Sequence, residues 1–129
     1  MSSIQVVVGR QVLDSRGHPT VEVEVTLNYN ARGRAIAPAG ASIGTGEAVE
    51  IRDGGEAFGG FGVEGALAAV NGEIARALKG RDAADQDAID KILIDLDGTA
   101  DKSRLGGNAM IATSLAVAHA AAAARKVPL

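Results

Sequence analysis

The clearest pattern in the chain is a strict alternation of apolar and polar residues over 21–27. Successive side chains of a strand point to opposite faces of a sheet, so the alternation places the apolar side chains of this segment on one face. Ile4, Val6 and Val8 predict a similar face near the start of the chain, although Val7 interrupts the alternation. Both segments are therefore predicted to be strands with one buried face.

Turn signals separate these strands and lead to a third. Gly and Pro within 16–19 favour a tight turn, and a second turn over 28–33 precedes a short strand expected at 34–37. Strands this close in sequence pair most simply as neighbours. The first third of the chain therefore predicts an antiparallel meander of three strands.

The periodicity changes after residue 62, where apolar residues recur at helical spacing. One helix is expected up to Gly80, and a second from just after Asp82 to Gly98, a residue type that commonly ends helices. Their predicted buried faces consist of Val63, Leu67, Val70, Ile74 and Leu78 in the first helix and of Ile89, Ile92, Leu93 and Leu96 in the second.

A third helix is expected from Asn108 to about Lys126, where alanine dominates. Alanine has the best helix propensity, and its small side chain lets a neighbouring element approach closely. Ile111, Leu115 and Ala118 align along this helix and are predicted to form its buried face.

Strands followed by helices are typical of the α+β class. We therefore predict a three-stranded antiparallel meander followed by a helical bundle that packs on one face of the sheet. The chain has 129 residues, the size of one domain, so residues 1–129 are treated as a single domain.

The connection over 38–62 is long for a compact domain, and long loops are often functional. A short element is expected within it, around 48–52. The glycine-rich part, 40–46, lacks the lysine that follows the last glycine of a P-loop. Its residues alone leave three interpretations open: a backbone cradle for an anion, a mobile lid hinged at its glycines, or an ordinary surface turn.

Composition narrows the function classes. The net charge is −3, and no basic patch is interleaved with aromatic residues, so nucleic acid is not an expected partner. The absence of cysteine removes disulfides and thiolate chemistry. We see neither a signal peptide nor a membrane span, and we expect a soluble cytoplasmic protein.

Two short motifs are weak when they are taken alone. Residues 60–65 match G-x-G-x-x-G, but no buried strand or crossover precedes them, so we interpret them as the flexible start of a helix. Asp95, Asp97 and Asp101 lack the glycine spacing and the closing glutamate of a calcium loop. They are predicted instead to cap the following turn.

The histidines and serines give no catalytic pattern. His18 and His119 belong to no metal-binding pair. No base is arranged in the sequence for Ser15, Ser42 or Ser114, so a nucleophilic triad is not indicated.

Charged residues lie in or beside the predicted strands: Arg10, Asp14, Arg16, Glu22 and Glu24. The simplest interpretation is the solvated face of a half-buried sheet. A patterned charged face can also serve as an interface with another subunit, because charge pairs fix the register of the contact.

Longer stretches add a stronger signal. Residues 13–22 are similar to D-S-R-G-N-P-T-V-E, residues 38–44 to P-S-G-A-S-T-G, and residues 47–54 to E-A-x-E-L-R-D-G. Residues 94–109 contain segments similar to D-L-D-G-T and K-S-x-L-G-x-N-A, and residues 120–129 are similar to A-A-A-A…P-L. In this order, and together covering nearly the whole chain, they resemble the N-terminal domain of enolase.

The resemblance implies a capping domain that packs on a (β/α)₈ barrel. The family reaction is the magnesium-dependent, reversible dehydration of 2-phosphoglycerate to phosphoenolpyruvate in glycolysis. A lysine base removes the proton α to the carboxylate, and magnesium ions stabilise the charge that develops. In the family these groups lie in the barrel, beyond residue 129, so the resemblance implies no catalytic residue in this chain. The isolated chain is expected to be inactive.

The resemblance assigns a substrate-closing role to one loop, Ala39, Gly40, Ala41, Ser42, Ile43 and Gly44. In the family a serine after the proline provides a carbonyl and a hydroxyl to the second magnesium, and the loop closes over a small phosphorylated acid. Ala39 stands at that position, so its carbonyl remains as a metal ligand but the hydroxyl is missing. Ile43 replaces a threonine of the family, and His18 replaces an asparagine.

Partners and alternatives follow from the same resemblance. Strand residues that match Arg10 and Glu22 pair across the enolase dimer, which implies a homodimer or higher oligomer in addition to the chain's own C-terminal barrel domain. One alternative is a paralogue that acts on a related phosphonate or carboxylate, with Ala39 and Ile43 reshaping the closed site. Another is a catalytically inactive, stand-alone dimerisation module.

Overall fold

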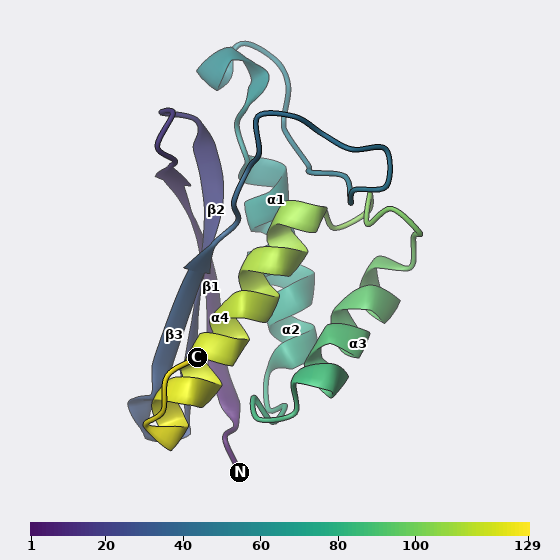
Figure 1. Ribbon diagram of the computed structural model, residues 1–129. Helices are drawn as coiled ribbons and strands as arrows, with labels where there is room; N and C mark the ends of the chain where they lie inside the picture. The colour runs from purple at the N-terminus through teal and green to yellow at the C-terminus, as the bar shows by residue number, and fades with distance from the viewer.

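A computed structural model describes residues 1–129 and confirms the predicted α+β fold. Three strands come first, β1 (Ile4–Leu13), β2 (Pro19–Leu27) and β3 (Arg32–Ile36), paired antiparallel in the order β1-β2-β3. Four α-helices follow and lie on one side of the sheet (Figure 1): α1 (Glu64–Ala69), α2 (Ala75–Leu78), α3 (Gln86–Asp97) and α4 (Gly107–Arg125). Shorter helical turns cover Asn28–Asn30, Ala57–Gly60 and Val70–Ile74.

The central strand β2 provides the middle of the core, as its alternation predicts. Its inward-facing side chains are at most 1 % exposed: Val21, Val23, Val25 and Leu27. Their burial against the helices drives the two layers together, because apolar area leaves water at both surfaces.

The predicted face of β1 is wrong after its first residue. Ile4 is buried, but Val6 and Val8 are 48 % and 36 % exposed, and Val7 is buried in their place. The pairing register of β1 with β2 shifts between Ile4 and Val6. An extra residue at such a bulge sends every later side chain to the opposite face of the sheet.

The predicted buried face of α4 is also wrong. Ile111 is 43 % exposed, and Leu115 and Ala118 are only partly buried. The helix instead turns small side chains toward β2 and β3, and several of them are fully buried: Ala109, Ala112, Ala116 and Ala120.

Close approach of the backbones explains this choice of face. A Cβ atom built at Gly33 of β3 would lie only 2.1 Å from the backbone nitrogen of Ala120. A glycine in the strand and alanine in the helix are therefore what allow α4 to pack directly on the sheet. By length and composition α4 is also apolar enough to cross a membrane, a test that the core helices of soluble proteins pass as well.

The first predicted helix is continuous in path but widens in its middle. α1 and α2 are joined by a π-helical turn, Val70–Ile74. Asn71 in this turn reaches the outer edge of β1, where its Oδ1 accepts from the Gly9 N–H at 2.8 Å and its Nδ2 donates to the Gly9 carbonyl at 3.1 Å. The side-chain amide thus satisfies backbone groups that an edge strand leaves unpaired.

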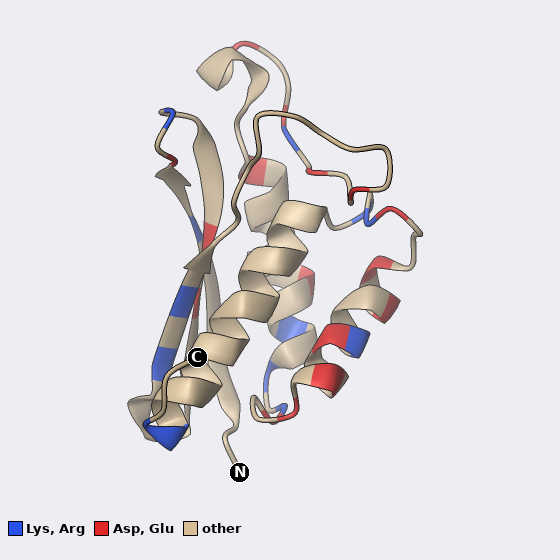
Figure 2. Cartoon of the chain, in the orientation of Figure 1, with Lys and Arg blue, Asp and Glu red and all other residues tan.

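α3 ends at Gly98, as predicted, but begins at Gln86, three residues later than expected. The Asp85 carboxylate accepts from the Ala88 N–H at 3.1 Å, and Gly98 ends the helix in the left-handed conformation, with φ of 73°. Acidic side chains gather on this helix and its flanking loops, whereas basic side chains follow β3 (Figure 2).

Candidate functional site

Three loops gather at one end of the molecule, around the N-terminal end of α4 (Figure 1). They are the β1–β2 turn, the segment after β3 and the loop 53–62. The short element expected around 48–52 is absent, because these residues form neither helix nor strand. We call residues 38–48 the cover segment.

The cover segment starts from a fixed point at the end of β3. The Ala37 N–H donates to the Val21 carbonyl at 2.9 Å, and the Ala37 carbonyl accepts from the Thr20 hydroxyl at 2.7 Å. All three residues are buried. The chain therefore leaves the sheet at Ala37 with both of its backbone groups satisfied.

A second fixed point lies where the chain returns. The Val49 N–H donates to the Asp101 carbonyl, and the Val49 carbonyl accepts from the Gly107 N–H, both at 2.7 Å. The Asn108 side chain then bonds both backbone groups of Ile51, accepting from its N–H at 3.1 Å and donating to its carbonyl at 3.0 Å. The returning arm is therefore held against the start of α4.

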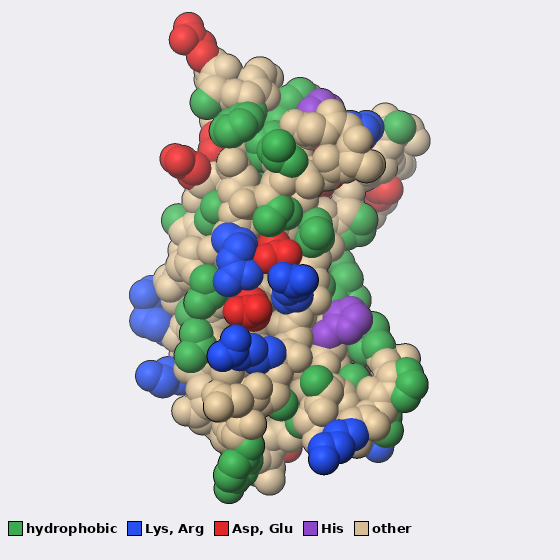
Figure 3. All heavy atoms as spheres, turned by 90° about the vertical axis from the view of Figure 1, so that its left-hand side faces the viewer, with side chains coloured by type: hydrophobic (Ala, Val, Ile, Leu, Met, Phe, Trp, Pro, Cys, Tyr) green, Lys and Arg blue, Asp and Glu red, His purple; other side chains and the backbone are tan.

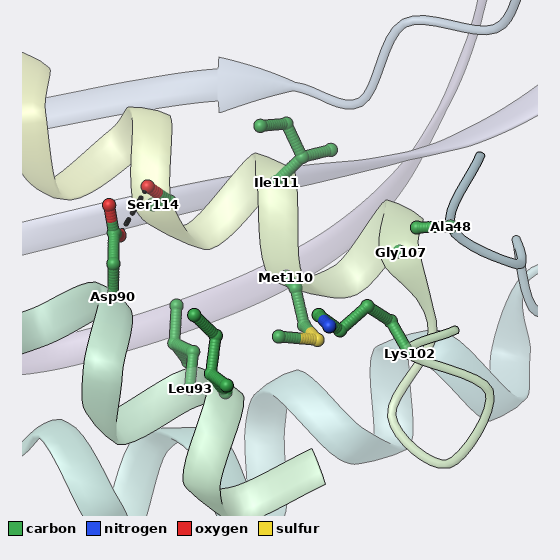
Figure 4. A pocket seen from close by; sticks show the side chains of 9 residues that line it. Ala48, Asp90, Leu93, Lys102, Gly107, Met110, Ile111 and Ser114 are labelled. Carbon is green, nitrogen blue, oxygen red and sulfur yellow. Dashed lines mark hydrogen bonds between the residues drawn. The ribbon is translucent and has the colours of Figure 1, made fainter. Parts of the chain in front are cut away.

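Two glycines allow this arm to lie so close to the helix. A Cβ atom at Gly107 would lie 2.9 Å from the Cβ of Ala48, and one at Gly106 would lie 2.6 Å from Cγ1 of Ile51. Figure 4 shows Gly107 and Ala48 facing each other at the edge of a hollow between α3 and α4. A side chain at either glycine would push the arm off the helix.

Between its two fixed points the cover segment is exposed and weakly held. It contains the whole predicted closing loop, Ala39, Gly40, Ala41, Ser42, Ile43 and Gly44, of which only Ala39 is partly buried. The hydrogen bonds that link the segment to the rest of the domain are two long ones, from Arg16 Nη2 to the carbonyls of Ala39 and Gly40 at 3.4 Å each. The segment can therefore move without breaking strong bonds.

A groove of about 640 Å³ lies between the cover segment and the returning arm. This volume is within the range of small-molecule sites. The groove is lined on the side away from the cover segment by Glu50, Arg52, Phe61, Asn108 and Ile111.

Arg52 ties three loops together at this groove. Its Nη1 donates to the carbonyls of Phe61, at 2.8 Å, and of Pro19, and its Nη2 lies 3.5 Å from the Glu50 carboxylate. The guanidinium carbon lies 5.8 Å from the centre of the Phe61 ring, and His18 stacks on that ring with centroids 4.5 Å apart. The Arg52 Nε is buried without a partner.

Charges of both signs lie around the groove, because Glu47, Glu50 and Arg52 line it and Arg16 donates to carbonyls of the cover segment. The Asp14 carboxylate organises the β1–β2 turn by accepting from the N–H groups of Arg16, at 2.8 Å, and His18, at 3.0 Å. The bond from His18 is the main cause of a lowered pKa for Asp14, so this carboxylate stays charged at neutral pH. Arg16 itself belongs to no ion pair and leaves a positive charge beside the cover segment.

The chain's own residues do not form a complete metal site. No group of three or more His, Asp or Glu side chains is placed to hold an ion. The Ala39 carbonyl, the predicted metal ligand, lies on the cover segment and accepts a long bond from Arg16. A carbonyl oxygen suits Mg²⁺, but near-octahedral coordination then needs ligands from outside this chain.

The outer face of the sheet carries the predicted interface pair. Arg10 Nη1 lies 2.8 Å from Glu22 Oε1, and Arg10 Nη2 lies 3.5 Å from Glu24 Oε1. The bond to Glu22 is the main cause of a raised pKa for Arg10. Figure 3 shows basic and acidic side chains alternating down this face. Val6 and Ile36, which the strand register places on the same face as Arg10, are also exposed. Arg10 and Glu22 thus meet within one chain.

The G-x-G-x-x-G match is a fixed helix start, not the flexible one expected. The Asp53 carboxylate accepts from the N–H groups of Glu64 and Gly65 at 2.8 and 2.9 Å. A Cβ atom at Gly62 would lie 2.8 Å from the same carboxylate. An anionic side chain therefore already occupies the position that a nucleotide phosphate would need.

Asp97 and Asp101 cap the turn after α3, as predicted, but Asp95 does not, because it lies within the helix and pairs with Lys91 at 3.0 Å. The Asp97 carboxylate accepts from the N–H groups of Leu105 and Thr99, both at 2.8 Å, and Asp101 accepts from the Ser103 N–H at 3.2 Å. Burial raises the pKa of Asp97, but these hydrogen bonds outweigh it and hold the pKa below its ordinary value.

Ser114 links two helices. Its hydroxyl donates to the Asp90 carboxylate at 2.6 Å across the hollow between α3 and α4 (Figure 4). Neither histidine lies in this cluster, because His18 stacks on Phe61 and His119 is exposed on α4. The arrangement joins α3 to α4 and contains no histidine to activate the hydroxyl as a nucleophile.

Sequence reasoning missed the groups that fix the ends of the cover segment. Thr20, Arg52 and Asn108 all lie within the motifs that carry the resemblance. Their hydrogen-bond partners are distant in the chain, however, and a local sequence pattern cannot predict a bond between residues 51 and 108.

The comparison with known protein families covers almost the entire chain. The family model of the enolase N-terminal domain matches residues 4–129. The match includes every strand, the cover segment with its two fixed points, and every helix. The chain therefore belongs to the enolase family, of which it carries the N-terminal domain.

Proposed function

We propose that the chain acts as the capping domain of a phosphopyruvate hydratase, a cytoplasmic lyase of glycolysis that interconverts 2-phosphoglycerate and phosphoenolpyruvate. The observation that carries this proposal is the exposed cover segment, which is fixed at Ala37 and Val49 and borders a groove between them. In this proposal the chain's own C-terminal barrel domain supplies the base and the metal carboxylates.

The cover segment would act by closing over the substrate. Closure excludes water from the reacting atoms and brings the Ala39 carbonyl to the metal. Bound magnesium stabilises the negative charge that develops when the proton α to the carboxylate leaves. The charge of Arg16, which lies beside the cover segment and belongs to no ion pair, supports a small phosphorylated acid as the ligand.

Assembly into a homodimer or higher oligomer is the second part of the proposal. The outer face of the sheet presents alternating charges together with exposed apolar side chains, a composition suited to a subunit interface. Arg10 and Glu22 are the residues proposed to contact the second subunit.

Ala39 and Ile43 favour a second candidate function. Ile43 is 80 % exposed and lines the groove, so closing the cover segment would bury an apolar side chain near the ligand. Together with the missing hydroxyl at Ala39, this supports a paralogue that acts on a related phosphonate or carboxylate.

Hydrogen exchange of the full-length protein tests these proposals. With Mg²⁺ and 2-phosphoglycerate, amides within 38–48 should exchange more slowly, while those of α3 serve as an unaffected internal reference. Turnover without such protection would remove the covering role. Protection by a phosphonate analogue, without turnover of 2-phosphoglycerate, would favour the paralogue. If neither ligand protected these amides, the remaining hypothesis would be the catalytically inactive dimerisation module.

A further inference from the structure

We infer that Asn108 is a positioning residue for the cover segment, because its carboxamide fixes the hinge about which the segment closes. This inference rests on the proposed covering role. It adds a residue that lines the groove but whose carboxamide is bonded to the backbone of Ile51, through which it acts on the cover segment.

The Asn108 carboxamide bonds the backbone of Ile51 in the way that a neighbouring β-strand would. Its Oδ1 accepts from the Ile51 N–H at 3.1 Å and its Nδ2 donates to the Ile51 carbonyl at 3.0 Å, so both backbone groups of one residue are satisfied by one side chain. Asn108 is only 3 % exposed, and its Oδ1 also accepts from the Ala109 N–H at 3.1 Å. Burial and three bonds leave this side chain a single rotamer to occupy.

The neighbouring contacts make the same point of the chain rigid. The Val49 N–H and carbonyl are each bonded at 2.7 Å, and Ile51 packs so close to Gly106 that a Cβ there would lie 2.6 Å from its Cγ1. α4 packs directly on the sheet at Gly33, so the hinge at Ile51 is bonded to a helix that is part of the rigid core. Movement is therefore confined to residues 38–48, where the bonds are few.

A loosened hinge would spread the cover segment over more conformations. Fewer of them would place the Ala39 carbonyl at a metal, so the competent fraction would fall and the apparent affinity with it. The Asn108→Ala variant should then raise the KM for substrate while the chemical step in the closed state is unchanged.

The chain offers a matched control in Asn71. Its carboxamide makes the same pair of bonds to the backbone of Gly9, at 2.8 and 3.1 Å, on the edge of β1. Asn71 is more exposed than Asn108, but Asn71→Ala removes the same two hydrogen bonds away from the cover segment. A general loss of stability therefore affects both variants, and a hinge effect affects only one.

The first experiment is residue-resolved hydrogen exchange on the chain alone. Asn108→Ala should speed exchange of the Ile51 amide about tenfold, which corresponds to the loss of a buried bond, whereas Asn71→Ala should speed only the Gly9 amide. Equal rates at Ile51 in both variants would overturn the inference. If Asn108→Ala does not fold, Asn108→Asp, which keeps the acceptor but loses the donor, should give a smaller increase at Ile51.

The second experiment measures steady-state kinetics of the full-length enzyme with Mg²⁺ and 2-phosphoglycerate. Asn108→Ala should raise KM at least about fivefold relative to Asn71→Ala, with kcat within about twofold of the unaltered enzyme. An unchanged KM in an enzyme whose residues 38–48 are protected by substrate would refute the role of Asn108. Absence of protection in the unaltered enzyme would refute the covering role itself, and the Ile51 exchange rates would still decide whether Asn108 fixes the arm.

Discussion

Replacement of Gly33 by alanine should be the most damaging single-methyl change in this domain. The added Cβ would lie 2.1 Å from the Ala120 nitrogen, 2.5 Å from the Ala116 carbonyl oxygen and 2.6 Å from the His119 carbonyl carbon. All three atoms belong to the helix backbone, so no side-chain rotamer change relieves the clash. An ordinary contact begins at 3.4 Å, and α4 would have to move outward by about 1.3 Å, the difference between 3.4 and 2.1 Å.

The magnitude follows from the two costs of that movement. Overpacking a core costs about 1–3 kcal/mol, and a gap of about 1 Å forfeits up to about half of the dispersion energy of the contacts it opens. The contacts at risk are those of the fully buried Ala112 and Ala116 with the sheet. We therefore expect Gly33→Ala to lower the free energy of unfolding by about 4 kcal/mol and Tm by roughly 15 °C.

Urea denaturation followed by circular dichroism measures this change, with Gly46→Ala as the control. A Cβ atom at Gly46 meets nothing within 4 Å, and its φ is not in the left-handed region, so this variant should stay within about 0.5 kcal/mol of the unaltered chain. A Gly33→Ala variant as stable as the Gly46→Ala variant would show that α4 does not rest on β3 through this glycine.

Three further changes test other parts of the structure. Asp97→Asn should cost about 2–3 kcal/mol at pH 7, because the Leu105 N–H loses its acceptor. The folded-state pKa of Asp97 is lowered, so its contribution to the free energy of unfolding is complete above about pH 4 and is lost as pH falls through that lowered pKa. If the difference in stability between Asp97→Asn and the unaltered chain stayed the same in acid, this reasoning would be contradicted. In the full-length protein, Ala39→Ser should restore a hydroxyl ligand and lower the Mg²⁺ concentration for half-maximal rate, and an unchanged magnesium dependence would count against it. Glu22→Arg in the full-length protein should leave Arg10 with only its 3.5 Å contact to Glu24 and weaken dimerisation at least about tenfold by sedimentation, whereas an unchanged dimer would place the interface elsewhere.

The sequence predicted the elements better than the faces they bury. The alternation over 21–27 reported the buried side of β2 correctly, because β2 is central and free of bulges. The same argument failed for β1, because the register shift after Ile4 exchanges the two faces of the strand. No residue in that segment predicts a bulge. In α4, the alignment of Ile111, Leu115 and Ala118 selected the wrong face, because the sheet accepts only the alanine face beside Gly33.

The candidate site was predictable as a segment but not as a mechanism. Glycine content and length singled out the loop after β3, and the resemblance gave it a role. The contacts that hold the loop could not be predicted from the sequence, because Asn108 and Ile51 are 57 positions apart and only the folded chain brings them together. The stacking of His18 on Phe61 has the same origin, since a turn and a distant loop meet at Arg52.

The two ends of the cover segment belong to different layers of the fold, and this has a mechanical consequence. One end leaves the sheet at Ala37, and the other is fixed to α4 by Asn108. The distance between them is set by how closely α4 packs on the sheet, which is the contact at Gly33. A change that lifts the helix must therefore move one hinge relative to the other, even though it lies far along the helix from the loop. The packing of α4 on the sheet therefore also sets the geometry in which the cover segment closes. Destabilising substitutions at Gly33 should disturb the cover segment before they unfold the chain.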